Sequence, residues 1–414
     1  MKMYINGEWT SGASQMDVRN PYTGEAFDTV PAGTVEDVNT AMASAERGAK
    51  AMRKLSAFDR YEILTRVVTL LNERQQDLGE TITREEGKVL SEGLLEVDRC
   101  IQTMTWSAEE AKRLFGETIP LDAAPDNQMK FGFSVRVPVG VVAAVTPFNF
   151  PLNLVAHKVG PAIAGGNSVV IKPASDTPLS ALKLTEILLD AGMPSEAIQC
   201  VTGSGSVIGD AVVSHNTVRK VTFTGSQEVG EQIMRTAGLK KVTMELGSNS
   251  PLIVLPDADV EKVALATVQN GYANAGQACI STQRVYADKK IYADYLDALK
   301  PMVAALPSGD PMADAIKVGP MVRESDAQRV ESWINEAVGA GARLIEGGGR
   351  NGAVLAPSIL ADVHPDMKIS REELFGPAVG VTPIEGIDEA IKYANDTRYG
   401  LSACLLYTSD AADE

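Results

Sequence analysis

Three side chains of this 414-residue sequence stand in places where they could take part in a reaction. Cys279 lies in the stretch NAGQACISTQRV, where a thiol is either a nucleophile on a loop or a small buried hydrophobe. Glu245 lies in the apolar stretch KVTMELG, where a carboxylate is either a general base or one half of a salt bridge. Lys172 ends the run VVIK, from which it could bind a ribose hydroxyl or a phosphate, or extend into solvent.

Two glycine-containing turns could bind a phosphate group. The stretch TGSQEVG places Gly225, Ser226 and Gly230 where a strand turns into a helix, and the free N–H groups at a helix N-terminus bind anions such as pyrophosphate. The stretch GSGSVIG, which contains Gly205 and Gly209, is a loose glycine-rich loop whose spacing differs from the dinucleotide fingerprint. Glycines in such turns also occur for structural reasons alone.

These residues are set in a pattern of helices and strands. The segment from about 33 to 116 has apolar residues at helical spacing, and strand-like runs alternate with helices after it. This alternation predicts an α/β fold with parallel sheets and helices on both faces. Ligands of such sheets bind outside the carboxyl ends of the strands, so strand-ending residues such as Asn149, Lys172 and Thr224 are the first to consider as contacts.

Composition and charge exclude several classes of partner. The net charge of −16 repels phosphate backbones and anionic membranes, so neither nucleic acid nor a membrane is an expected partner. The four cysteines are far apart and the three histidines have no ligand spacing, which predicts a reducing compartment and no metal site. The start, MKMYINGEWTSG, lacks a signal-peptide core, and no apolar run reaches the ~18 residues of a membrane span. We therefore expect a cytoplasmic protein.

An ordered set of motifs carries a resemblance to a known family. The stretches TPFNFP, KPASDTP, FTGSQEVG, MELG, GQACISTQR and EELFGP occur in this order over nearly the whole chain. Together they resemble the NAD(P)-dependent aldehyde dehydrogenase superfamily. ELGSNSP with GQACISTQR is most similar to the branch that oxidises lactaldehyde, phosphonoacetaldehyde, sulfolactaldehyde and related small aldehydes. The resemblance implies two Rossmann-like parallel-sheet domains, one for the cofactor and one catalytic, plus a small β oligomerisation arm.

The resemblance also implies a mechanism with three catalytic residues. Cys279 as thiolate attacks the aldehyde carbon, and the side-chain amide of Asn149 together with the Cys279 backbone N–H stabilises the thiohemiacetal oxyanion. Hydride transfer to the nicotinamide leaves a thioester. Glu245 then activates the water that hydrolyses this thioester to a carboxylic acid.

NAD or NADP is the cofactor that the resemblance implies. Ser175 stands three residues after Lys172, where many NAD-preferring members carry a glutamate, and a serine does not repel a 2′-phosphate. A second departure is that Gly247 is followed by Ser248 and Asn249, where many members have Gly-Lys. The expected cofactor-binding residues are Thr146, Pro147, Phe148, Lys172, Ser175, Gly205, Gly209, Phe223, Thr224, Gly225, Ser226, Gly230, Leu246, Glu373 and Phe375.

The domain organisation follows from the same resemblance. Residues 1–117 and 139–247 are expected to form the NAD(P)-binding domain, 118–138 the bridging strands, and 248–403 the catalytic domain. The alternating residues of 129–140 predict a half-buried strand that pairs subunits of a homodimer or homotetramer in the full-length family form. The tail 404–414, CLLYTSDAADE, does not resemble the family, and we expect that a shortened C-terminus would impair solubility and assembly.

Three alternatives remain beside hydrolytic aldehyde oxidation. A CoA-acylating or phosphorylating member of the same fold would pass the acyl group to another acceptor and would not need Glu245. A non-catalytic protein on this scaffold would tolerate the loss of Cys279, Glu245 or Asn149, all of which are present. An inactive, shortened form is the third alternative.

Overall fold

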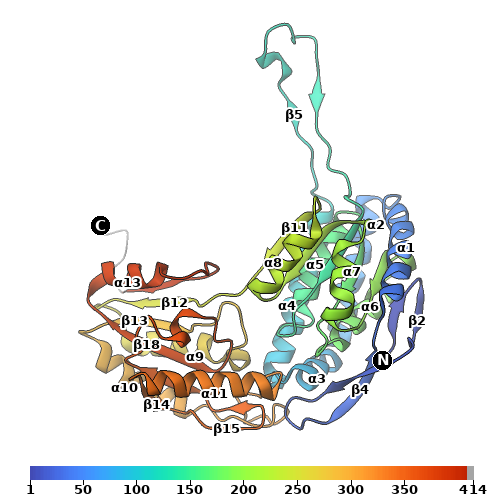
Figure 1. The fold of residues 1–414 in the computed structure, drawn as a ribbon. Coiled ribbons are helices and arrows are strands. Elements are labelled where there is room, and N and C mark those ends of the chain that lie inside the picture. Colours follow the sequence, from blue (N-terminus) through green and yellow to red (C-terminus); the bar gives the residue numbers. More distant parts are fainter. Residues whose placement is uncertain (408–414) are drawn as a thin grey trace.

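The computed structural model describes residues 1–407, which form two α/β bodies, each built on its own sheet (Figure 1). The first sheet has seven strands in the order β11-β10-β7-β8-β9-β1-β2, and the second has six in the order β14-β17-β18-β13-β12-β19. The chain passes from the first sheet to the second between β11 and β12. Two parallel-sheet bodies of mixed α/β content confirm the predicted fold class.

The first sheet has its strands at Met3–Ile5 (β1), Glu8–Thr10 (β2), Val141–Val145 (β7), Ser168–Lys172 (β8), Ile198–Cys200 (β9), Val218–Thr224 (β10) and Lys241–Glu245 (β11). Strands β7 to β11 are parallel, while β1 and β2 add an antiparallel edge. Strand β7 pairs with β8 on one side and β10 on the other, so the strand order reverses there. Such a reversal leaves a crevice at the carboxyl ends of the strands, where cofactors bind.

Helices cover this sheet, and the first four of them form the helical segment predicted near the N-terminus. They are Val35–Met52 (α1), Ala57–Glu73 (α2), Gln75–Glu86 (α3), Leu90–Ala111 (α4), Asn153–Ala164 (α5), Leu179–Asp190 (α6), Asp210–Ser214 (α7) and Gln227–Ala237 (α8). Helices α1 and α2 each begin with a capping box, in which Thr34 or Ser56 and the aspartate three residues later satisfy each other's backbone N–H groups. Short turns lie at Leu121–Ala123 (η1), Ser195–Ala197 (η2) and Gly205–Gly209 (η3).

The second sheet is formed by Pro251–Val254 (β12), Arg284–Asp288 (β13), Arg343–Glu346 (β14), Ser358–Ala361 (β17), Ala378–Ile384 (β18) and Cys404–Leu406 (β19). All neighbouring strands except β14 and β17 run parallel. The associated helices are Val260–Gly271 (α9), Tyr292–Ala304 (α10), Glu324–Gly339 (α11), Lys368–Arg371 (α12) and Gly386–Asn395 (α13), with a short turn at Ala273–Gly276 (η4). Hairpins lie at Gln15–Arg19 (β3) with Ala26–Pro31 (β4) and at Arg350–Asn351 (β15) with Val354–Leu355 (β16).

A two-stranded arm projects from the first body (Figure 1). It contains Thr118–Ile119 (β5) paired with Gly132–Phe133 (β6). In the single chain the apolar residues of the strand predicted over 129–140 are not half-buried, because Phe131, Phe133, Val135 and Val137 are all at least 64% exposed, and its pairing with a second subunit stays a prediction. A two-stranded ribbon has no layer behind it against which alternating apolar residues could pack.

The segment predicted as a tail lies partly within the described residues. Cys404–Leu406 (β19) pairs in parallel with Leu252–Val254 of β12 and forms the edge of the second sheet. Residues 408–414 of that tail lie outside the described residues. Among residues 1–407, no helix is both long and apolar enough to cross a bilayer.

Candidate active site

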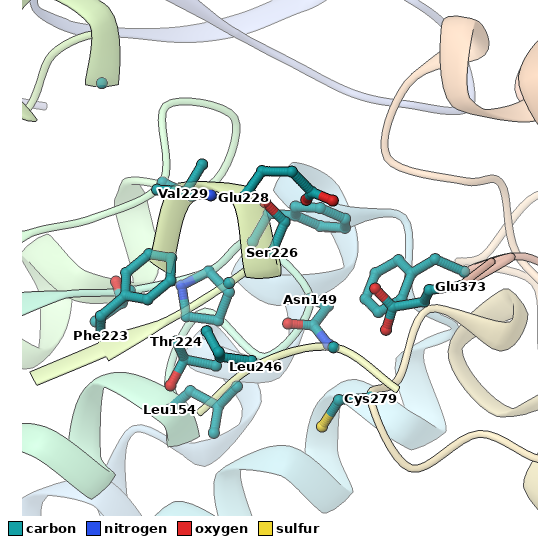
Figure 2. Close-up of a pocket in the computed structure, with 18 of the residues that line it drawn as sticks. Asn149, Leu154, Phe223, Thr224, Ser226, Glu228, Val229, Leu246, Cys279 and Glu373 are labelled. Atoms are coloured by element: carbon teal, nitrogen blue, oxygen red, sulfur yellow. Dashed lines mark hydrogen bonds between the residues drawn. The ribbon is translucent and has the colours of Figure 1, made fainter. Parts of the chain in front are cut away.

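A cavity of about 570 Å³ lies where the carboxyl ends of the first sheet face the second body (Figure 2). Most of the residues predicted from the sequence line it, although they come from separate strands and loops. They are Thr146, Pro147, Phe148, Asn149, Lys172, Ser175, Gly205, Phe223, Thr224, Gly225, Ser226, Leu246, Cys279, Glu373 and Phe375. The fold therefore gathers the strand-ending residues around one space large enough for a cofactor and a small molecule.

Three predicted residues do not line this cavity. Gly209 ends the η3 turn, and a Cβ at that position would meet no atom within 4 Å. Gly230 lies in α8, where a Cβ would meet Leu246 Cδ2 at 2.6 Å, so this glycine allows the helix to pack closely on the segment after β11. Glu245 ends β11 beside the cavity.

The loop that carries Cys279 has an unusual backbone. Asn274 and Ala275, in the short η4 turn after helix α9, both have left-handed conformations, with φ of 51° and 53°. A turn then follows in which the Ser281 N–H donates to the Ala278 carbonyl at 2.9 Å and Cys279 occupies the second position. Left-handed residues other than glycine are costly, so the surrounding contacts must hold this loop in place.

Gly276 makes the closest of these contacts. Its φ is +70°, and a Cβ there would meet the Gly376 carbonyl oxygen at 2.1 Å. The loop that carries Cys279 and the loop of Glu373 and Phe375 therefore touch backbone to backbone. Only glycine fits such an approach without displacing one of the two loops.

We expect Gly276→Ala to reduce the free energy of unfolding by about 2 kcal/mol or more, because it adds both a left-handed alanine and a clash. Gly339→Ala is a matched control, since that glycine ends α11 with open space around its Cβ position. Urea unfolding of both variants measures the effect. Equal stability of the two variants would contradict the packing described here.

Asn149 is buried, and both its backbone carbonyl and its side-chain amide form hydrogen bonds. Its carbonyl oxygen accepts hydrogen bonds from Lys88 Nζ at 2.8 Å and Asn274 Nδ2 at 3.0 Å. Its own Nδ2 donates to the Gln277 carbonyl at 2.8 Å, which uses one of the two N–H bonds of the amide. Within residues 1–407 the Cys279 backbone N–H donates to no other residue, so both donors can serve an oxyanion near the thiol.

The thiol of Cys279 is partly buried beside two carboxylates. Burial raises the pKa of the Cys279 thiol above its ordinary value, and the nearby Glu373 and Glu245 carboxylates raise it further. The backbone N–H groups of Cys279 and Ile280 oppose this rise. The cavity as it stands therefore favours the neutral thiol, and a bound cationic nicotinamide ring would favour the thiolate.

Glu245 is exposed, although it lies in an apolar stretch of the sequence. Strand β11 is the outermost strand of its sheet, and its residues alternate between exposed and half-buried. Within residues 1–407 Glu245 forms no ion pair shorter than 4 Å, so the salt-bridge alternative is wrong for this structure. Its carboxylate is free to bind a water molecule.

Lys158, which the sequence analysis did not single out, lies beside Glu245. Burial lowers the pKa of Lys158 to about 8, although the Glu245 carboxylate opposes this shift. Lys158 Nζ donates to Thr224 Oγ1. A lysine inside the apolar run LVAHKVGPAIA was the one signal in the sequence that could have drawn attention to it.

The other end of the cavity carries the residues expected to bind the adenosine half of a dinucleotide. Lys172 is buried, its Nζ donates to the Pro173 carbonyl at 2.8 Å, and burial lowers its pKa to about 8. Ser175 Oγ donates to the Gly203 carbonyl at 3.2 Å. The carboxylate nearest along the chain, Asp176, is held in a bidentate ion pair by Arg323, with Arg323 Nε 2.9 Å from Oδ1.

Glu373 faces Cys279 across the cavity (Figure 2). The Ser248 backbone N–H donates to Glu373 Oε1 at 2.9 Å. A Cβ on Gly247 would meet Glu373 Oε2 at 2.2 Å, so this glycine leaves the space that the carboxylate occupies. Burial raises the pKa of Glu373, and the Ser248 hydrogen bond opposes this rise. Further cavity-lining residues not predicted from the sequence include Arg329, Trp333, Arg398 and Tyr399.

Comparison with known proteins settles which family has this arrangement. The model of the aldehyde dehydrogenase family matches residues 9–413. The chain belongs to the aldehyde dehydrogenase family. A similar relative, the 3-sulfolactaldehyde dehydrogenase of Priestia aryabhattai, is 47% identical over 408 residues, which cover 99% of this chain and 85% of the relative.

Two more aldehyde dehydrogenases show how far the likeness extends. The succinate-semialdehyde dehydrogenase (NADP+) of Escherichia coli is 38% identical over 406 residues, 96% of this chain and 83% of the relative. The crystal structure of an NADP-dependent glyceraldehyde-3-phosphate dehydrogenase from Bacillus halodurans, complexed with NADP, superposes with a TM-score of 0.96 at 36% identity. That superposition covers 100% of this chain and 86% of the other.

This aldehyde dehydrogenase is therefore an oxidoreductase that uses NAD or NADP to convert an aldehyde to a carboxylic acid through a cysteine thiohemiacetal and thioester. The cavity fits such a cofactor, because its walls are the strand-ending residues and the N-terminus of α8 at the point where the strand order reverses. When bound, the nicotinamide supplies the hydride acceptor. The protein's own residues bind and orient the aldehyde and move its protons.

Proposed function

We propose that Cys279, Asn149 and Glu245 carry out the oxidation of a small, polar aldehyde in this cavity. The observation that supports this most is the common location of Cys279 and Asn149 with two unused N–H donors. A thiolate that attacks a carbonyl carbon turns the carbonyl oxygen into an oxyanion, and donors already in place stabilise it without reorganisation. These donors are one N–H of the Asn149 amide and the backbone N–H of Cys279.

Glu245 is proposed to act on the thioester. Its exposed carboxylate at the end of β11 can take a proton from a water molecule, and it is close enough to Cys279 to influence the thiol. Hydrolysis then releases the acid and restores the thiol. Transfer to CoA needs no such base, so the position of Glu245 favours hydrolysis over CoA acylation.

The substrate is proposed to be a short hydroxylated aldehyde that bears an anionic group, of the sulfolactaldehyde type. This rests on the 47% identity to a 3-sulfolactaldehyde dehydrogenase and on the carboxylic aldehyde named for the relative from Escherichia coli. The test follows cofactor reduction by absorbance with sulfolactaldehyde, lactaldehyde, succinate semialdehyde and an uncharged aldehyde of similar size, each with and without CoA. A strict requirement for CoA, or preference for the uncharged aldehyde, would overturn the proposal.

Cofactor choice is proposed to depend on Ser175. The neighbouring carboxylate of Asp176 is neutralised by Arg323, so no free negative charge stands beside Ser175 to repel a 2′-phosphate. We therefore expect the enzyme to use NADP, and Ser175→Glu to raise the preference for NAD over NADP by roughly tenfold or more, about 1.4 kcal/mol. Kinetics with both cofactors measure this ratio.

Ser175→Gln is the matched control, because it adds a side chain of the same size without charge. We expect it to change the ratio much less than the glutamate. If both substitutions shifted the ratio equally, size and not charge would decide cofactor choice.

We further propose that the enzyme works in the cytoplasm as a homodimer or homotetramer. Cys100 and Cys200 are buried free thiols, which fit a reducing compartment. The exposed apolar residues of the arm at 118–138 are suited to pairing with a second copy of the chain.

A further inference from the structure

A buried glutamate, one of whose carboxylate oxygens has no partner within residues 1–407, lies behind the catalytic loop. Glu86, the last residue of α3, is fully buried, and its Oε1 receives only a long hydrogen bond of 3.4 Å from Gln277 Nε2. Its Oε2 has no partner in the described part of the chain. Asn274 Oδ1 is a second buried acceptor without a partner there, and the Asn274 side chain lies close enough to Glu86 to lower the pKa of its carboxyl group by hydrogen bonding. Such unpaired buried atoms require an explanation.

Exchanging the oxygen and nitrogen positions of the Asn274 side-chain amide would not give the unpaired atoms suitable partners. Asn274 Nδ2 donates to the carbonyl oxygens of Asn149 at 3.0 Å and Gln277 at 3.4 Å. A reversed amide would set its oxygen against those two carbonyls, which have no hydrogen to give. The Asn274 oxygen therefore stays on the other side and needs a donor.

The charges around Glu86 also disfavour its ionised form. Among the described residues Lys88 is the cation that acts on Glu86, and Lys88 Nζ lies 2.6 Å from Glu96 Oε2. Glu92 and Glu96, both on α4, add negative charge to the same buried cluster. Burial raises the pKa of Glu86 well above its ordinary range, while the attraction of Lys88 and, after it, hydrogen bonding by the Asn274 side chain oppose this rise.

The remaining carboxylates of the cluster already have donors. Both oxygens of Glu92 accept the Asn274 backbone N–H at 3.1 Å, and Glu96 Oε1 accepts the N–H groups of Leu152 and Asn153 at the start of α5. Glu85 accepts the N–H groups of Leu179 and Ser180 at the start of α6. Glu86 is thus the carboxyl group of this cluster whose hydrogen bonding is least complete, although burial also raises the pKa of Glu85 and of Glu92.

We propose that Glu86 holds a proton and, by donating it to Asn274, positions the amide of Asn149. A protonated Oε2 supplies the one donor that Asn274 Oδ1 lacks. Asn274 then stays in its left-handed conformation with Nδ2 on the Asn149 carbonyl, while Glu86 Oε1 holds Gln277, whose carbonyl accepts from Asn149 Nδ2. The acid thereby fixes the oxyanion donor without touching the substrate. This positioning role rests on the function proposed for Asn149.

The proton on Glu86 is tested by infrared spectroscopy and by stability against pH. The difference spectrum of wild type minus Glu86→Gln at neutral pH should show the band of a protonated carboxyl group. Because the folded protein holds this proton more tightly than the unfolded chain, stability should fall as pH rises from the ordinary glutamate pKa toward the raised one. In Glu86→Gln the loss of stability over this pH range should be smaller than in the wild type. A difference band of an ionised carboxylate would overturn the proposal.

The positioning role is tested by kinetics normalised to active sites. Glu86→Gln keeps a donor for Asn274 and should retain kcat within about threefold, whereas Glu86→Leu has none and should lose about 10- to 100-fold in kcat with little change in the KM for cofactor. Glu85→Gln is the matched control, since it should lower the Tm but leave kcat unchanged. Wild-type kcat in Glu86→Leu, or equal loss in both Glu86 variants, would overturn the role.

Asn149→Ala, assayed alongside, separates this proposal from the proposed function. If Asn149→Ala keeps wild-type turnover, the oxyanion role of Asn149 is wrong, whatever the result at Glu86. If Asn149→Ala is inactive and Glu86→Leu is unimpaired, only the positioning role of Glu86 fails. The infrared result stands independently of both.

Discussion

Replacing Cys279 with alanine is expected to reduce aldehyde oxidation by roughly 10³-fold or more, because alanine has no thiol with which to form the covalent intermediate. Cofactor binding should survive, since the proposed cofactor contacts come from the ends of β7, β8 and β10 and from the N-terminus of α8, which line the cavity. Steady-state turnover and a cofactor titration by fluorescence measure the two properties separately.

Cys404→Ala is the matched control for this experiment. Cys404 is an exposed thiol at the start of β19, on the far edge of the second sheet. We expect this variant to retain turnover. Wild-type turnover in Cys279→Ala would show that the mechanism proposed here is wrong, and loss of cofactor binding would show that the substitution had disturbed the cavity.

Glu245→Gln is expected to separate hydride transfer from hydrolysis. The thiolate attack and hydride transfer do not need the Glu245 carboxylate, so one equivalent of reduced cofactor should form per active site in a burst. The thioester should then persist, and steady-state turnover should fall by about 10²- to 10⁴-fold because the water lacks its base. Rapid-mixing absorbance measures the burst, and mass spectrometry detects the acylated chain.

Glu261→Gln is the matched control, since Glu261 is an exposed glutamate in the first turn of α9. It should show normal turnover without accumulation of acyl-enzyme. Slow turnover of Glu245→Gln without a burst would place Glu245 before hydride transfer, for example in activating the thiol. Such a result would favour a role for Lys158, which lies beside both Glu245 and the end of β10.

Much of this protein's chemistry could be predicted from short stretches of its sequence. The order of the motifs around Asn149, Lys172 and Cys279 predicted the family, and the comparisons confirm it. The alternation of strands and helices predicted the α/β fold class, which is also confirmed. These predictions succeed because helix caps, apolar periodicity and strand-ending residues are local properties of the chain.

Only the tertiary structure could decide how exposed or constrained these residues are. Glu245 is exposed because β11 is the outermost strand, and strand order is not encoded in the strand's own sequence. The alternating apolar residues of the arm are exposed because no layer covers a two-stranded ribbon. With a further strand beside β11, or a layer of side chains against the arm, the same local sequence patterns would have been buried.

The hydrogen-bond network behind Asn149 shows most clearly which contacts local sequence patterns cannot predict. Glu86 and Gln277 are 191 residues apart in the chain, and Asn149 and Gln277 are 128 residues apart. Gly276 is required by its contact with Gly376 and not by its own turn alone. The sequence by itself determined which chemical groups the chain contains and which strand or loop carries each. The packing of the two sheets around one cavity decided which of these chemical groups come into contact, because contacts between distant segments depend on strand order and register.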